Sequence, residues 1–298
     1  MELYREKNKI YFSDFIEAAK ELQSESIDLI ICDGPYGLRK GEWDCQNSIQ
    51  EFNLSLLKIF SRLLVPGGTV YLFGKHDCLD FIDYREYLDL KRRIVWYQPS
   101  RLAQGRKNYT NNYDIIAYFT KKGKESCFNL NSIRVPQLVE LEHRKRCEKV
   151  PSVRGGKFGK TRFHDDGKNP GDVWGDIKQL TYKSKELLDR AYLNTIQKPE
   201  KLMERLVLAS SQPGNLILDP FAGTGSACVV AQRLGRNFIG FENDSKLCRV
   251  ANQRLSFSAV GERQKNHLYY GQVGSVSEKA PAVTNEHANS WKGTAEHS

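Results

Sequence analysis

The chain has 298 residues, with 45 lysines and arginines, 36 aspartates and glutamates, and a formal net charge of +9. This length suits one large α/β domain with an insertion, or two domains, and the basic balance permits nucleic acid as a partner without requiring it. The seven cysteines form no pair or cluster at zinc spacing, and no apolar run reaches membrane-spanning length, so we expect a reducing compartment, no structural metal and no membrane contact.

A first candidate site follows a predicted strand near the amino terminus. Residues 13–22 predict a helix with Ser13 as its cap, and 27–32 predict a short buried strand that ends in Asp33-Gly34-Pro35-Tyr36. A carboxylate, a turn and an aromatic ring at this end of a strand suit a binding site, because open α/β sheets bind ligands there. An ordinary Asp-Gly-Pro turn is the alternative.

The stretch from residue 49 to 120 continues the alternation of helices and strands. Pro66-Gly67-Gly68 predicts a turn. The basic, glycine-containing stretch 101–112 predicts a loop that either contacts phosphate or is only solvated. The predicted elements are helices over 49–64 and 81–90, and strands over 69–73, 92–97 and 113–119.

Positive charge concentrates between residues 121 and 190, where long apolar runs are rare. A charge run is usually a solvated face, and it becomes a candidate nucleic-acid surface only in a suitable context. The basic residues in question are Arg144, Lys145, Arg146, Arg154, Lys157, Lys160 and Arg162.

The stretch 215–243 is the most informative one, since it predicts a complete strand, turn, helix and strand unit. A strand over 215–218 places Asp219 at its tip, and Gly223-Thr224-Gly225 supplies a turn where backbone can approach a ligand. A small-residue helix and a second strand follow, and Glu242 ends that strand. An acid about 20 positions beyond a glycine turn is where doubly wound α/β folds bind ribose hydroxyls.

Other nucleotide folds match this stretch less well. A dinucleotide fingerprint requires a third glycine where this chain has Cys228, and no lysine of a P-loop follows the glycines. A merely structural turn is disfavoured by the two acids that flank the unit. The sequence therefore predicts a doubly wound α/β fold with a nucleoside-cofactor site.

Asp219-Pro220-Phe221-Ala222-Gly223-Thr224-Gly225-Ser226 resembles the S-adenosylmethionine motif of the DNA amino-methyltransferases. In that family the motif's acid and aromatic neighbour hold the methionine end of the cofactor. The acid of the next strand, here Glu242 with Asn243 beside it, holds the ribose. The motif order, catalytic turn first and cofactor turn last, resembles the beta-type subgroup, and the resemblance covers roughly residues 8–255.

Two shorter segments carry the same resemblance. Gln197-Lys198-Pro199 is similar to a box that contacts the methionine part of the cofactor, with a helix cap as the alternative. Proline suits the first turn of the helix that we predict over 200–209. Asn111-Asn112-Tyr113-Asp114 resembles a segment that lines the target-base pocket.

The resemblance implies a Rossmann-like methyltransferase sheet with an inserted basic target-recognition region. Residues 1–120 would form the catalytic half, 121–190 the recognition region and 191–256 the cofactor-binding half. Residues 257–298 predict a disordered tail. The basic residues named above are then expected to contact DNA.

Asp33-Gly34-Pro35-Tyr36 is similar to the family's Asp-Pro-Pro-Tyr signature, with glycine in place of the first proline. An exocyclic base amine is a poor nucleophile, and the Asp33 carboxylate and Gly34 carbonyl would bond its two hydrogens as the methyl group approaches. Tyr36 would stack on the flipped base. Gly34 keeps the carbonyl but loses the rigidity of proline.

We therefore expect a DNA methyltransferase that transfers the methyl group of S-adenosylmethionine to N6 of a flipped adenine. In the family, aspartate at the position of Asp33 goes more often with adenine, and N4 of cytosine is the alternative. C5 methylation of cytosine is excluded because no proline precedes a cysteine. A catalytically silent DNA-binding protein, and methylation of RNA or of a protein amide, stay open.

The expected partner is double-stranded DNA. The sequence leaves open whether the protein forms a homodimer and whether a cognate restriction endonuclease accompanies it. We expect it in the cytoplasm, at the nucleoid of a bacterium, or in the nucleus of a eukaryote.

Overall fold

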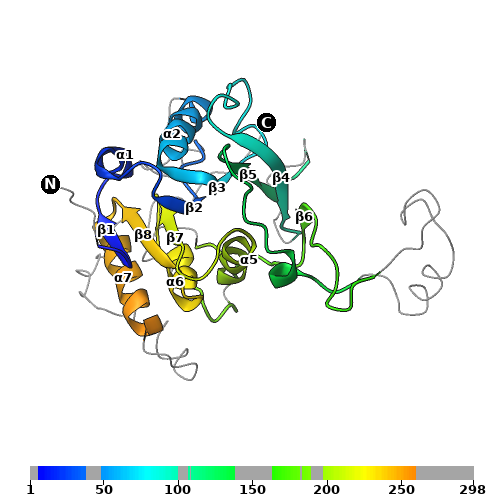
Figure 1. Cartoon of the computed structure of the whole chain (residues 1–298). Coiled ribbons are helices and arrows are strands. Elements are labelled where there is room, and N and C mark those ends of the chain that lie inside the picture. Colours follow the sequence, from blue (N-terminus) through cyan, green and yellow to red (C-terminus); the bar gives the residue numbers. More distant parts are fainter. Residues whose placement is uncertain are drawn as a thin grey trace, which may run out of the picture.

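A single mixed β-sheet organises the chain in the computed structural model, which describes residues 6–37, 48–99, 107, 109–137, 163–181, 183–188 and 197–259 (Figure 1). The eight strands stand in the order β1-β8-β7-β2-β3-β5-β4-β6. The strands are β1 (Lys9–Phe12), β2 (Ile27–Cys32), β3 (Leu64–Gly74), β4 (Asp89–Tyr97), β5 (Tyr113–Thr120), β6 (Val173–Trp174), β7 (Leu216–Asp219) and β8 (Asn237–Glu242).

The strands β1, β8, β7, β2 and β3 are mutually parallel, so their carboxyl ends share one edge of the sheet. β5 runs antiparallel to β3 and to β4. Asp33 follows β2, while Asp219 and Glu242 are the last residues of β7 and β8. The topology therefore brings the three predicted acids to the same edge, which confirms the Rossmann-like fold class.

Helices cover both faces of the sheet (Figure 1). The helices are α1 (Phe15–Ala18), α2 (Ile49–Leu63), α5 (Glu200–Ser210), α6 (Ser226–Arg233) and α7 (Ser245–Ala259), with 3-10 helices η1 (Ala19–Glu21) and η3 (Leu130–Ile133). Among the described residues, none of these helices has the length and apolar character that crossing a membrane requires.

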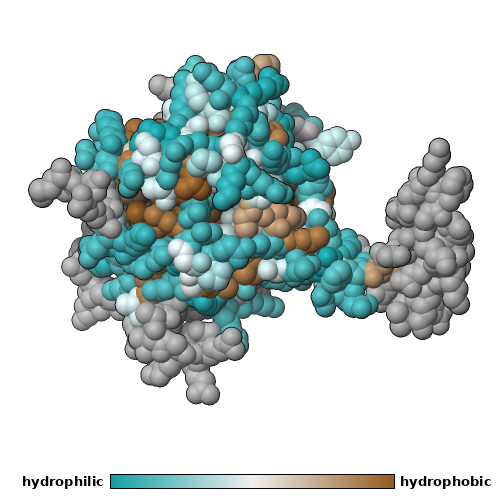
Figure 2. All heavy atoms as spheres, viewed as in Figure 1, coloured by the Kyte–Doolittle hydropathy of each residue, from teal (hydrophilic) through white to brown (hydrophobic). Residues whose placement is uncertain are grey.

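Alternate residues of the strands enter two separate hydrophobic cores. Along β2, Leu29 and Ile31 pack on the side of α5, α6 and α7, whereas Ile30 and Cys32 pack on the side of α1 and α2. Both faces of the central strands are therefore buried, as the apolar run from Leu29 to Cys32 in β2 requires. The visible surface is mainly hydrophilic, with apolar side chains gathered in small patches (Figure 2).

Three expectations about local structure were wrong. The cap of α1 is Asp14 instead of Ser13, because the Asp14 carboxylate accepts the Glu17 amide at 3.2 Å. The span 81–90 forms turns and the start of β4 instead of a helix, and Phe81 has φ +62°, which a helix does not tolerate. Pro66-Gly67-Gly68 lies within the bounds of β3 instead of preceding the strand.

The other predicted helices and strands are present with small shifts at their ends. α7 extends to Ala259, past the predicted end of the core at residue 256. The stretch 101–106 and the seven basic residues expected to contact DNA, between 144 and 162, lie outside the described residues. Their roles stay predictions.

Candidate active site

The carboxylate of Asp33 lies immediately after β2 and is held from two sides. The Tyr36 hydroxyl donates to Oδ1 at 2.7 Å. The Lys198 ammonium donates to Oδ1 at 2.7 Å and to Oδ2 at 2.5 Å, although 165 residues separate the two in sequence. The side chains of Lys198 and Asp33 are 11% and 22% exposed, so the pair borders solvent without lying in it. Asp33 is thus positioned at an accessible edge by a cation and a phenol.

Two lysine ammonium groups lie close to the Tyr36 ring. Lys198 Nζ is 5.3 Å and Lys75 Nζ is 5.4 Å from the ring centroid, within the range of cation–π attraction. Lys75 is itself paired with Asp114 Oδ1 at 2.5 Å, and the Gln98 amide donates to Asp114 Oδ2 at 3.0 Å. These contacts and the hydrogen bond to Asp33 fix the position of the Tyr36 ring.

Burial raises the pKa of Tyr36 well above its usual range, and the negative charges of Asp33 and Asp114 raise it further. The phenol therefore stays protonated at neutral pH and remains a hydrogen-bond donor to Asp33. In this state Tyr36 has a structural and stacking role, and it does not serve as a base.

Gly34 allows the turn Asp33–Tyr36, here called the catalytic turn, to lie against the turn Asp219–Gly225, here called the cofactor turn. A Cβ atom built on Gly34 would lie 3.0 and 3.1 Å from two ring carbons of Phe221. The Phe221 ring is also in contact with Phe15 and Phe52, at centroid distances of 6.0 and 6.2 Å. The glycine that departs from the family signature therefore admits the phenyl ring close to the backbone of this turn, and Pro35 follows it as a half-buried residue.

Asp219 is a buried carboxylate whose charge the surrounding protein compensates poorly. It is 5% exposed, and its Oδ1 accepts the Phe221 amide at 3.3 Å. Burial raises the pKa of Asp219 well above its usual range, and the charges of Asp33 and Glu242 raise it further. A bound cation would relieve this cost, and S-adenosylmethionine carries positive charge on its sulfonium and ammonium groups. The residues present therefore fit the expected cofactor.

Glu242 joins the ends of β7 and β8 through backbone donors. Its Oε2 accepts the Gly223 amide at 2.7 Å and its Oε1 accepts the Asp244 amide at 2.8 Å. Burial raises the pKa of Glu242, and these two amides oppose that rise. Asn243, expected beside the ribose, is exposed next to it.

The glycine turn is open above its backbone. Gly223 has φ +53° and Gly225 φ +76°, in the left-handed region that favours glycine. A Cβ atom on Gly223 would meet no atom within 4 Å, whereas one on Gly225 would lie 3.0 Å from Ala251. Space for a ligand is thus at Gly223, and Gly225 is required for packing of α6 against α7. Ala222 is fixed by its amide, which donates to Phe241 O at 2.8 Å.

Thr224 and Ser226 turn their side chains toward the interior. Nη1 of Arg254, from α7, donates to the Thr224 carbonyl at 2.5 Å and to both hydroxyl groups at 3.3 Å. Nη2 of Arg254 donates to Glu200 at 2.8 Å. The fully buried Arg254 therefore connects the cofactor turn to the start of α5, two residues after Lys198.

The three residues of the Gln197-Lys198-Pro199 segment make different contacts. The Gln197 side chain is buried, accepts the Leu188 amide at 3.1 Å and donates to Glu186 O at 2.8 Å, so it anchors the segment. Pro199 is the N-cap residue of α5. Lys198 alone extends into the site, where the structure places it on Asp33.

Sequence reasoning missed several of these residues. Lys75 lies immediately after β3, next to the site, and the rule that sheets bind ligands at strand ends could have found it. Asp114, in the segment that resembles one lining the target-base pocket, was named from the sequence and lies near the start of β5. Arg254 lies in a helix without any local motif. No sequence signal indicated that Lys198 pairs with Asp33.

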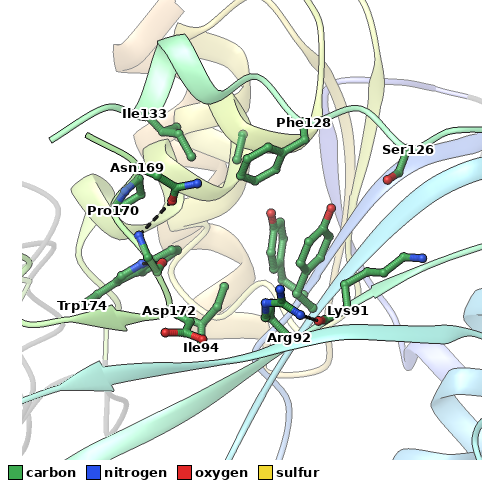
Figure 3. A pocket seen from close by; sticks show the side chains of 14 residues that line it. Lys91, Arg92, Ile94, Ser126, Phe128, Ile133, Asn169, Pro170, Asp172 and Trp174 are labelled. Atoms are coloured by element: carbon green, nitrogen blue, oxygen red, sulfur yellow. Dashed lines mark hydrogen bonds between the residues drawn. The ribbon is translucent and has the colours of Figure 1, made fainter. Parts of the chain in front are cut away.

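A separate hollow of about 510 Å³ lies between β4, the segment around η3, and the residues that lead into β6 (Figure 3). The lining side chains include the stacked pair Tyr71 and Tyr118, together with Phe128, Trp174 and Arg92. None of the predicted catalytic or cofactor residues contributes to it. The hollow is therefore distinct from the candidate active site.

Comparison with known proteins agrees with this geometry. The N6_N4_Mtase family model, described as DNA methylase, matches residues 27–253. Type II methyltransferase M.HpaI of Haemophilus parainfluenzae is 34% identical over 271 residues, which cover 86% of this chain and 78% of the relative. DNA adenine methyltransferase YhdJ of Escherichia coli is 30% identical over 267 residues, which cover 85% and 84%.

A solved structure supports the fold. The putative DNA modification methylase TTHA0409 of Thermus thermophilus, complexed with S-adenosyl-L-methionine, matches with a TM-score of 0.55 at 21% identity, covering 85% of this chain and 95% of that one.

Proposed function

This chain belongs to the N6_N4_Mtase family of DNA methylases, and we propose that it methylates N6 of adenine in duplex DNA. It is an S-adenosylmethionine-dependent DNA methyltransferase of the adenine-N6 or cytosine-N4 type. The observation that carries the proposal is the convergence of Asp33, Asp219 and Glu242 at one edge of the sheet, with the Tyr36 ring beside Asp33.

Asp33 and Gly34 would activate the target amine. The Asp33 carboxylate accepts one amine hydrogen and the Gly34 carbonyl accepts the other, so the nitrogen lone pair leaves conjugation with the ring and points toward the methyl donor. The bound cofactor supplies an electrophilic methyl group on sulfur. After transfer, the nitrogen carries one proton too many, and Asp33 is placed to receive it before solvent does. Tyr36 stacks on the base and offsets part of the cost of unstacking it.

Asp219 and Glu242 would bind the cofactor at opposite ends. Asp219, whose ionised form is disfavoured by burial and by the charges of Asp33 and Glu242, gains most from a cationic ligand and therefore faces the methionine end. Glu242, at the end of β8 beside the open space above Gly223, faces the ribose hydroxyls. The Phe221 ring, packed on Gly34, lies between the two halves of the site.

Two observations favour adenine over cytosine. Aspartate stands at position 33, and the relative YhdJ carries the name DNA adenine methyltransferase. N4 methylation of cytosine uses the same amine chemistry and is the second candidate. The convergence of all three acids disfavours a catalytically silent DNA-binding protein.

The test is to incubate the protein with isotopically labelled S-adenosylmethionine and mixed-sequence duplex DNA, and to identify the labelled nucleoside by mass spectrometry. Label in N6-methyladenine supports the proposal. Label in N4-methylcytosine instead supports the second candidate, N4 methylation of cytosine. Absence of label in DNA, with label appearing in RNA or protein under matched conditions, refutes it.

A further inference from the structure

The contact between Lys198 and Asp33 places a cation where the target amine must bind. The ammonium group donates to both carboxylate oxygens, at 2.7 and 2.5 Å. An exocyclic amine presents the same chemistry, an N–H donor directed at a carboxylate. While the ion pair stands, the ammonium group therefore occupies the face of Asp33 that the base requires.

We propose that Lys198 is a place-holder that leaves Asp33 when the cofactor binds, by moving to the carboxylate of the cofactor's amino-acid end. This inference rests on the proposed function, and it makes Lys198 a positioning residue for the reaction. Asp33 becomes available to a base only after the cofactor is in place, so the enzyme binds cofactor before it engages the target amine.

The surroundings of Lys198 permit such a movement of its side chain. Besides Asp33, the ammonium group contacts the faces of Tyr36 and Phe73, at 5.3 and 5.5 Å from the ring centroids. Both distances lie within the range of about 6 Å over which cation–π attraction acts, so the ammonium group has two neutral partners besides Asp33. Lys75, the second lysine close to the Tyr36 ring, is already held by Asp114.

The backbone that carries Lys198 is fixed relative to the cofactor turn. Arg254 connects the Thr224 carbonyl to Glu200, and Gln197 is bonded on both sides of its amide. Residues on each side of Lys198 are thus anchored, and only its long side chain is free to change partner. The exchange costs little because one carboxylate replaces another.

The charges of the site select the new partner. S-adenosylmethionine carries two positive groups and one carboxylate. The buried Asp219 attracts the positive groups and its negative charge repels the carboxylate. Lys198, on the neighbouring acid Asp33, is the cation placed to receive that carboxylate.

Calorimetric binding of two nucleosides tests the exchange without DNA or catalysis. S-adenosylhomocysteine carries the amino-acid carboxylate, and 5′-methylthioadenosine lacks the whole amino-acid end. Lys198→Met should weaken S-adenosylhomocysteine binding about tenfold or more and change methylthioadenosine binding less than about twofold. Lys201→Met removes the same charge from an exposed position of α5 and should leave both affinities unchanged.

Asp33→Asn supplies the decisive comparison. When Lys198 is present, Asp33→Asn frees the lysine for the cofactor's carboxylate and should tighten S-adenosylhomocysteine binding. When Lys198 has been replaced by methionine, Asp33→Asn has no lysine to free. The effect of Asp33→Asn on affinity should therefore differ between the two backgrounds by about three- to tenfold. Equal effects of Asp33→Asn in the two backgrounds overturn the exchange, as does equal weakening of both nucleosides by Lys198→Met. Failure of the wild-type protein to bind either nucleoside would instead refute the proposed function.

Discussion

Arg254 provides a quantitative test of how the cofactor turn is held. Its side chain is completely buried, and it bonds the Thr224 carbonyl, the Thr224 and Ser226 hydroxyls, and Glu200. Arg254→Met removes the cation and leaves these acceptors without their donor. Breaking a buried ion pair on one side costs about 3–5 kcal/mol.

The structure favours the lower end of that range. Glu200 keeps a second partner, since Arg233 donates to its other oxygen at 2.6 Å, so its charge is not left uncompensated. Part of the stabilisation is also already lost, because the buried Nε of Arg254 has no hydrogen-bond partner among the described residues. We expect Arg254→Met to lower the free energy of unfolding by about 3 kcal/mol. A domain with about 5–15 kcal/mol of stability, the usual range, remains folded after such a loss.

Urea unfolding of the ligand-free protein measures this loss, and Arg233→Met is the matched control. Arg233 binds the same glutamate but its side chain is 42% exposed, so its removal should cost less than about 1 kcal/mol. Affinity for S-adenosylhomocysteine should fall several-fold in Arg254→Met and hardly change in Arg233→Met. A loss below about 1 kcal/mol for Arg254→Met, or equal losses for the two variants, would refute the bridging role.

The remaining predictions concern Asp219, Asp33, Gly34 and the DNA surface. The pKa of Asp219 is raised in the folded protein, whereas in the unfolded chain it is about 3.9. Between these two pKa values the folded ligand-free protein binds more protons than the unfolded chain, so its stability falls as the pH rises from about 4 toward the raised pKa. Asp219→Asn should therefore raise the melting temperature at pH 8, with a smaller gain at pH 5, and should weaken S-adenosylhomocysteine binding at least tenfold; an equal gain at both pH values contradicts the assignment. Asp33→Asn should lower methylation of DNA at least a thousandfold, and retention of a tenth of the activity would show that Asp33 does not take part in the reaction. Gly34→Ala should displace the Phe221 ring, which would lie 3.0 Å from the new Cβ, and should weaken cofactor binding about three- to tenfold. In a chain that already carries Phe221→Ala, Gly34→Ala should leave the cofactor affinity unchanged. Replacing Arg144, Lys145 and Arg146 by glutamine should reduce the salt dependence of DNA binding, by about 0.9 in slope for each phosphate that the protein no longer neutralises; an unchanged slope places the DNA surface elsewhere.

Local sequence patterns predicted the elements that carry the site. The strand ending at Cys32 and the unit from Leu216 to Glu242 were found because apolar runs, glycines and terminal acids lie within a few residues of one another. The fold then follows, since parallel strands align their carboxyl ends at one edge. The sequence placed Asp33 and Asp219 each at the carboxyl end of a strand, and in the structure the charge of Asp33 raises the pKa of Asp219.

Interactions between distant segments could not be predicted in this way. Lys198 and Asp33 are 165 residues apart, and Arg254 reaches Thr224 across 30 residues, so no periodicity or spacing relates them. The wrong helix at 81–90 has a related cause. Leu79 and Leu88 are buried in the core next to α2, and tertiary packing of these separate residues outweighs the helical spacing of the segment between them.

The electrostatics of the site explain why a lysine pairs with Asp33, the residue proposed to accept the target amine. Three carboxylates at one edge repel each other, and burial adds to the cost of Asp219 and Glu242. A cationic cofactor relieves this cost at Asp219 but not at Asp33, whose substrate is a neutral amine. In the structure, Lys198 neutralises Asp33 at 2.5 Å. If the ammonium group stayed there during the reaction, it would repel the positive charge that develops on the methylated nitrogen. The proposed displacement of Lys198 would therefore serve both binding of the base and transfer of the methyl group, and it would make both steps depend on the cofactor through one side chain.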